Sequence, residues 1–306
     1  MINKIKQQFI DLMAVGECIS YGSACPSLII PSLHEKGVLP LTGSAMCLLD
    51  LINKNLKITP RLLMSRYCVW IGELAKNKEA LLERIDESLI RSVHFFLTNN
   101  TTFGLSPVSE LAIDSSSLVR LAPLAFYLAR YEEMFSKNPP FMYHLIHELS
   151  ALTVGHRRAS VAVGIYLIIA RDLIIARVAK NKYLTPTQTK QVARLAINKA
   201  LIYYNSTYEY RGETGHYALL QFNKFQQMHL ETVTIKELGK TKYAVDTLLL
   251  SLCIFFRYPH FSGALRQLEV IKLPDVGALT ASLYAIAYGA ELNITYKKRF
   301  EQMLGS

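Results

Sequence analysis

The polar segment that leads to Arg120 carries residue types suited to binding a phosphate or a sugar. Asp114 is followed by three consecutive serines, Ser115, Ser116 and Ser117, and Arg120 comes three residues after the last of them. Serine hydroxyls can bond to a ribose or a phosphate, and a guanidinium matches a phosphate with two parallel hydrogen bonds. The same run is also typical of a helix cap, and Arg120 is equally suited to a structural salt bridge. The residues alone leave both interpretations open.

Histidines and nucleophiles give weaker signals. His144 and His147 have the helical spacing of a metal site, but no third ligand is identifiable beside them, so we predict no metal there. His216 lies in a polar cluster with Thr214, and we interpret this cluster as a surface loop rather than the lining of a cleft. No Ser-His-Asp or Cys-His signature can be placed from the sequence.

Composition favours a folded protein with a mildly basic surface. The chain has 306 residues, of which 51% are hydrophobic and 19% charged, so a large core is expected and disorder is not. The formal net charge of +10 is spread along the chain rather than gathered into one patch. Phosphate-bearing ligands are compatible with this charge. No RNA-binding or DNA-binding motif is present, so we expect no specific nucleic-acid partner.

Cysteine usage and hydropathy predict an intracellular protein. The five cysteines include no CxxC pair, which favours reduced, mostly buried thiols in the cytoplasm or another reducing compartment. The most apolar stretch, 160–170, is too short to span a bilayer and predicts a buried helix, so no membrane span is expected. Residues 1–15 lack the long apolar core of a signal peptide.

Helical periodicity dominates the chain, which predicts an all-α fold in a single domain over 1–306. Thr59-Pro60 and Thr185-Pro186 each combine a capping threonine with a proline at the first helical position, and Gln188 adds a capping box. One segment, 231–236, is a strand candidate. The expected helices include 77–98, 116–130, 140–152, 156–180, 186–206, 243–256 and 275–289.

The last of these helices has a stripe of small residues. Gly277, Ala281, Ala285 and Gly289 recur every four residues, so they share one helical face. Such a face lets a second helix approach closely. We therefore predict a central, buried helix.

Several segments, in this order along the chain, resemble the ADP-ribosylglycohydrolase family. Gly16-Glu17 stands where the family has Gly-Asp, and residues 41–46, Leu-Thr-Gly-Ser-Ala-Met, stand on its Asp-Asp-Thr-x-Met region. Arg120 with Pro123-Leu124 matches the family's Arg-x-x-Pro-Leu, and Leu152-Thr153 matches its Leu-Thr-His step without the histidine. Residues 272–289 resemble the C-terminal Asp-x-Asp-Thr helix. The resemblance spans nearly the whole chain.

This resemblance implies a compact helical domain with a central cleft, in which family members cleave the bond between ADP-ribose and an acceptor. Two magnesium ions held by aspartate pairs assist that reaction. Here the first pair reads Thr42-Gly43, and the second falls within Lys272-Leu273-Pro274-Asp275. Because magnesium needs several oxygen ligands, we predict that the metal pair is absent and that no cofactor is bound.

The resemblance and the lost aspartates together predict a pseudoenzyme. It would bind ADP-ribose or a nucleotide-like ligand through Ser44, Lys272 and the segment 115–120, or it would bind a protein partner. The alternative is an active, metal-independent ADP-ribosyl or N-/O-glycosyl hydrolase. In that case Glu17, Asp275 or His156 would act as acid or base, since two suitably separated carboxyl groups can hydrolyse a glycosidic bond.

Overall fold

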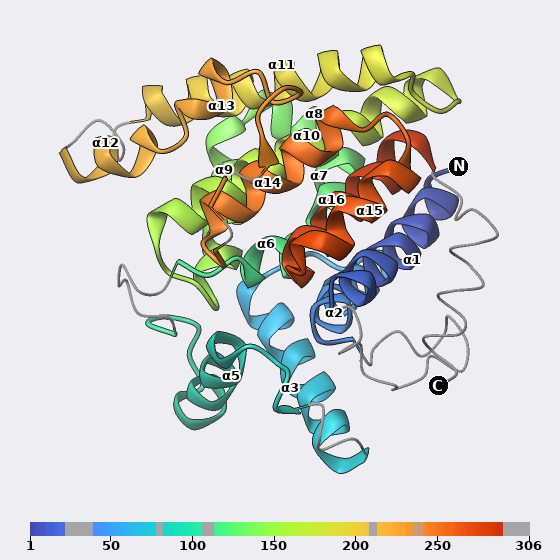
Figure 1. The fold of residues 1–306 in the computed structure, drawn as a ribbon. Helices are drawn as coiled ribbons and strands as arrows, with labels where there is room; N and C mark the ends of the chain where they lie inside the picture. The colour runs from blue at the N-terminus through green and yellow to red at the C-terminus, as the bar shows by residue number, and fades with distance from the viewer. Residues whose placement is uncertain are drawn as a thin grey trace.

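The computed structural model describes residues 1–21, 39–77, 82–105, 113–207, 213–235, 238–239 and 241–289. Throughout these ranges the regular secondary structure is helical, and strand pairing is limited to one isolated bridge between Asp114 and Tyr243. The prediction of an all-α fold is therefore confirmed (Figure 1). The helices are α1 (Ile2–Tyr21), α2 (Pro40–Asn53), α3 (Pro60–Asn77), α5 (Glu87–Asn99), α6 (Ser116–Leu121), α7 (Leu124–Arg130), α8 (Glu132–Lys137), α9 (Pro139–Ala151), α10 (Arg157–Lys180), α11 (Pro186–Ser206), α12 (Glu213–Leu220), α13 (Lys224–Gln227), α14 (Ala244–Arg257), α15 (Phe261–Ile271) and α16 (Pro274–Tyr288).

Local signals placed several helix boundaries correctly. Helix α3 begins at Pro60, and the Thr59 hydroxyl accepts a hydrogen bond from the Leu62 N–H at 3.3 Å. Helix α11 begins at Pro186 with the full capping box of Thr185 and Gln188.

Three predicted elements differ from the structure. The helix expected over 77–98 is interrupted, because the Asp86 side chain accepts the Leu89 N–H and starts α5 anew. The helix expected over 116–130 is divided into α6 and α7 at Pro123. The prediction of a strand over 231–236 is wrong for its described part. There the N–H groups of Thr232 and Val233 both donate to the carbonyl of His229, which forms a turn.

Helix α10 lies at the centre of the fold and contacts α7, α9, α11 and α14 (Figure 1). By length and composition alone it is apolar enough to cross a membrane. However, 83% of its most apolar window is buried inside the protein, as in the core helix of a globular domain. The prediction of a buried helix over the apolar stretch at 160–170 is confirmed.

The tightest helix contact joins α1 to α16, which lie side by side in Figure 1. A Cβ atom added at Gly16 would lie 2.1 Å from the carbonyl oxygen of Gly277, and one added at Gly277 would lie 2.1 Å from the carbonyl oxygen of Gly16. The two backbones therefore touch, which only glycine at both positions allows. Ala281 borders the same contact, so the small-residue face of α16 is used as its sequence predicts.

The cysteines depart in part from expectation. Cys47 and Cys253 are buried free thiols, and Cys68 is a partly buried free thiol. Cys18 in α1 is disulfide-bonded, so the expectation of reduced cysteines is wrong at this position. Cys25 lies outside the described residues.

The α1–α16 contact predicts a strong dependence of stability on Gly277. We expect Gly277→Ala to lower the free energy of unfolding by about 2–3 kcal/mol or more, because a methyl group there must push the two backbones apart. Urea denaturation measures this change. The matched control is Gly72→Ala on α3, where nothing lies within 4 Å of the added Cβ and a gain of about 0.5–1 kcal/mol is expected. Equal effects of the two substitutions would contradict the proposed contact.

Candidate functional site

A cavity of about 720 Å³ opens where the first residues of several helices meet. Its wall includes Leu41 in the first turn of α2, the Asp86 cap of α5, Ser116 at the start of α6 and Asp275 in the first turn of α16. Tyr21, the last residue of α1, completes one side. Helix N-termini carry partial positive charge and attract carboxylates or anionic ligands. This arrangement explains why carboxylates gather around the cavity.

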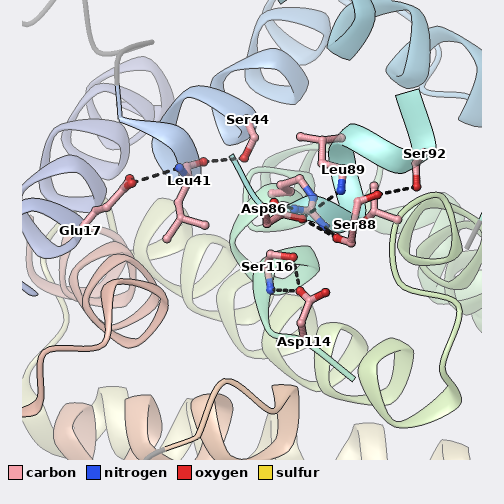
Figure 2. Close-up of polar contacts among 11 residues, drawn as sticks. Glu17, Leu41, Ser44, Asp86, Ser88, Leu89, Ser92, Asp114 and Ser116 are labelled. Carbon is pink, nitrogen blue, oxygen red and sulfur yellow. Dashed lines mark hydrogen bonds and ion pairs between the residues drawn. The ribbon is translucent and has the colours of Figure 1, made fainter. Parts of the chain in front are cut away.

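Glu17 supplies the negative charge at the start of α2. The Leu39 N-cap position has no capping side chain. Instead, the Glu17 carboxylate reaches across from α1 and accepts the N–H of Leu41 at 3.1 Å (Figure 2). It also accepts the N–H of Thr42 at 2.8 Å and the Thr42 hydroxyl at 2.7 Å. Glu17 is fully buried and does not line the cavity. Burial raises its pKa to about 7, against the opposing effect of these hydrogen bonds.

Asp86 and Arg120 form the wall on the α5 side. Asp86 caps α5 by accepting the Leu89 N–H (Figure 2). It also pairs with the guanidinium of Arg120, which donates to the Thr153 hydroxyl at 2.7 Å. Arg120 is 1% exposed and lies behind the cavity wall rather than in it. Of the two interpretations that the sequence left open for Arg120, this geometry favours the structural salt bridge. Its role is to hold Asp86 and Thr153 in place.

The serine run divides between the cavity and the core. Asp114 accepts the N–H and the hydroxyl of Ser116, which starts α6 (Figure 2). The Ser115 hydroxyl bonds to the carboxylate of Asp275, and both groups line the cavity. Ser117 is fully buried away from it, with a hydroxyl that has no hydrogen-bond partner among the described residues. Thus Ser115, Ser116 and Asp275 are brought together.

Asp275 is the titratable group best placed for chemistry. Burial raises its pKa to about 6, the Ser115 hydrogen bond opposes this rise, and the negative charge of Asp114 adds to it. A carboxyl group with such a pKa can hold or release a proton near neutral pH.

The other predicted residues lie elsewhere. The His156 ring caps α10 by accepting the N–H of Arg158 at 3.1 Å. The Ser44 hydroxyl donates to the Leu41 carbonyl at 2.7 Å and is buried in α2. Lys272 is an exposed residue that ends α15 in a left-handed conformation, with φ of 57°. None of these three side chains lines the cavity.

The donor set at this site does not suit a pair of magnesium ions. The Thr42 hydroxyl is engaged by Glu17, Gly43 has no side chain, and the described residues contain no cluster of three or more acidic, histidine or cysteine side chains placed to hold a metal. Asp275 shares the cavity wall with Asp86 and Asp114, but Asp86 is paired with Arg120 and Asp114 accepts two hydrogen bonds from Ser116, so too few oxygens remain for a hard cation, which takes six or more. We therefore assign no step at this site to a metal.

Sequence reasoning missed several cavity residues. Three cations line it, Arg84, Arg91 and Lys242, and none of them forms an ion pair within the described part of the chain. Tyr21 and Asp86 were also missed. For Asp86 a signal existed, because Asp86-Glu87-Ser88 is typical of a helix start and should have divided the helix expected over 77–98.

The overall architecture is similar to that of a known structure, an "ADP-ribosylglycohydrolase-related protein complex", with a TM-score of 0.59 and 17% sequence identity. The similarity covers 99% of this chain and 96% of the other. At this identity the likeness shows the fold alone, so this chain has an all-helical fold of the ADP-ribosylglycohydrolase type. No family model matches the sequence. No curated protein matches it either.

The raised pKa of Glu17 predicts how stability depends on pH. Because the folded protein holds the Glu17 proton more tightly than the unfolded chain does, its free energy of unfolding is higher near pH 5 than near pH 8. It falls as the pH rises from the ordinary glutamate pKa of 4.5 to about 7. Asp275 contributes in the same direction. We expect Glu17→Gln, which mimics the protonated acid, to reduce this fall by an amount on the order of 2 kcal/mol.

Urea denaturation of the wild type and the variant at pH 5 and pH 8 measures this difference. Glu133→Gln, on the exposed side of α8, is the control and should leave the fall unchanged. A Glu17→Gln variant with the same fall as the wild type would contradict the account of Glu17.

Proposed function

We propose that this protein is a pseudoenzyme of the ADP-ribosylglycohydrolase fold that binds ADP-ribose, or a nucleotide-like ligand, in the cavity beside Asp275. It does so without the two-magnesium hydrolysis that the family carries out. One observation carries the proposal. The cavity beside Asp275 is open, while the backbone N–H of Thr42 at the start of α2 is already hydrogen-bonded to Glu17.

The size of the cavity supports a ligand of this class. Small-molecule sites commonly occupy about 300–1,000 Å³, and this cavity measures about 720 Å³. Its lining mixes the cations Arg84, Arg91 and Lys242 with carboxylates that can accept hydrogen bonds from hydroxyl groups. ADP-ribose offers both partners, two phosphates for the cations and ribose hydroxyls for the carboxylates. A ligand with phosphates but no hydroxyls would leave the carboxylates unmatched.

The N-terminal half of the site supports the loss of hydrolysis. Thr42 and Gly43 replace the aspartate pair of the resembled family, and the donors at this helix start point to Glu17 instead of to a ligand. Glu17 is fully buried, so it cannot act on a substrate in the cavity. No second acid or base of the predicted set lies beside Asp275 in the cavity wall.

Isothermal titration of the full chain with ADP-ribose, with and without magnesium, tests the proposal. We expect binding of similar affinity in both buffers. Arg91→Gln should weaken it about tenfold, because it removes one charge-assisted contact to phosphate. Lys182→Gln, an exposed lysine that does not line the cavity, should leave it unchanged.

Other outcomes of this titration decide against the proposal. Binding that strengthens markedly with magnesium would show that a metal site exists after all. No binding in either buffer would overturn the proposal of an ADP-ribose ligand and turn attention to a protein partner, since the similar structure is that of a protein complex.

A metal-independent hydrolase is the second candidate, favoured by the raised pKa of Asp275 within the cavity. If Asp275 acts as a general acid, any release of ADP-ribose from an ADP-ribosylated substrate should fall at least about a hundredfold in Asp275→Asn, in line with general acid catalysis. ADP-ribose binding by the same variant is the control for folding. Activity that survives the substitution would exclude Asp275 from the reaction.

A further inference from the structure

A second cavity lies near the other end of α1. It measures about 650 Å³ and is formed between the N-terminal half of α1, the C-terminal end of α2 and Arg130 at the end of α7. Its lining combines two cations, Lys6 and Arg130, with amide side chains. The cleft beside Asp275 lies at Tyr21, fifteen residues further along α1, so the two cavities are separated by about 22 Å of helix.

Lys6 is unusual because it is a lysine that is only 5% exposed and has no carboxylate partner within the described part of the chain. Its ammonium group donates to the side-chain oxygen of Asn53 at 2.8 Å. Burial, and then the positive charge of Arg130, lower its pKa. A buried cation next to a second cation is costly unless an anion compensates for both.

Arg130 approaches the same end of α2. Its guanidinium donates through one nitrogen to the side-chain oxygen of Asn55 and to the carbonyl of Ile52 at 3.3 Å. These bonds stabilise the negative end of the helix dipole. A guanidinium has five N–H donors, so most of its capacity remains for a ligand.

The two asparagines are oriented by these cations. Since Asn53 and Asn55 each turn the side-chain oxygen to a cation, each NH2 group is left as a donor. The site therefore presents an ammonium, a guanidinium and two amide NH2 groups as hydrogen-bond donors.

The acidic residue in the lining is already paired. Asp50 accepts from Lys54 at 3.0 Å and from Arg66 at 3.1 Å. Within the described residues neither Lys6 nor Arg130 is among its ion-pair partners.

We infer that this cavity is a second ligand site, which binds the phosphate group of a small phosphorylated molecule between Lys6 and Arg130. The planar fork of Arg130 suits two phosphate oxygens, and the compact ammonium of Lys6 suits a third. The cavity is larger than a phosphate ion needs, so it also has room for an attached sugar. This site is separate from the cleft and does not depend on the function proposed for it.

Titration of the full chain with inorganic phosphate and with ribose 5-phosphate tests the inference. We expect both to bind, and tighter binding of ribose 5-phosphate would identify a sugar phosphate rather than free phosphate as the better ligand. Arg130→Gln should weaken binding at least about tenfold. Lys57→Gln is the matched control, because it removes an exposed positive charge shortly after the same helix end but does not line the cavity, and it should change the affinity less than about twofold.

A measurement on the unsubstituted protein guards against misfolding of Arg130→Gln. In ¹⁵N-labelled wild type, phosphate should shift the side-chain amide signals of Asn53 and Asn55. Phosphate should move the Asn53 and Asn55 signals in Arg91→Gln as it does in the wild type, because Arg91 lines the cleft and not this cavity, which separates the two sites. The inference is overturned if phosphate moves neither amide signal, or if a folded Arg130→Gln binds phosphate as tightly as the wild type.

Discussion

The backbone contact between Gly16 and Gly277 is the constraint on which the rest of the site depends. Because α1 and α16 touch at these glycines, the residues beside them have fixed positions. Glu17 follows Gly16 and is carried under the start of α2, while Asp275 precedes Gly277 by two residues and is carried into the cavity wall. Because neither glycine has a side chain, the two helices meet closely, and this contact positions the carboxylates of both Glu17 and Asp275. A larger residue at either glycine would separate the helices and move both acids.

Carboxylates near the cavity serve mainly to start helices. Glu17 stabilises the start of α2, Asp86 that of α5 and Asp114 that of α6, each by accepting backbone N–H groups. Asp275 differs, because its bond is to the Ser115 hydroxyl and its carboxylate faces the cavity. In the resembled family, aspartates at the start of α2 would hold metal ions. In this chain the backbone N–H groups of Leu41 and Thr42 at the start of α2 donate to Glu17, a buried acid from α1.

The sequence predicted the helical class, most long helices and the close packing of α16, because periodicity, threonine and proline caps and the small-residue stripe are local signals. Through the family resemblance, the sequence also predicted that Ser115, Ser116 and Asp275 belong to one site. It failed where the answer depends on tertiary contacts. The alternative of an active hydrolase required Glu17 to face the cleft, but which side of α1 is covered depends on the docking of α2. Arg84, Arg91 and Lys242 were missed, since exposed cations have no pattern until the fold gathers them around one cavity.

The most direct test of the central claim is a crystal structure of the protein grown with ADP-ribose and manganese, with anomalous scattering used to locate the metal. We expect ADP-ribose in the cavity beside Ser115 and Asp275, with no anomalous peak next to Thr42. A pair of manganese ions bound between Thr42 and Asp275 would contradict it and restore the two-metal hydrolase mechanism.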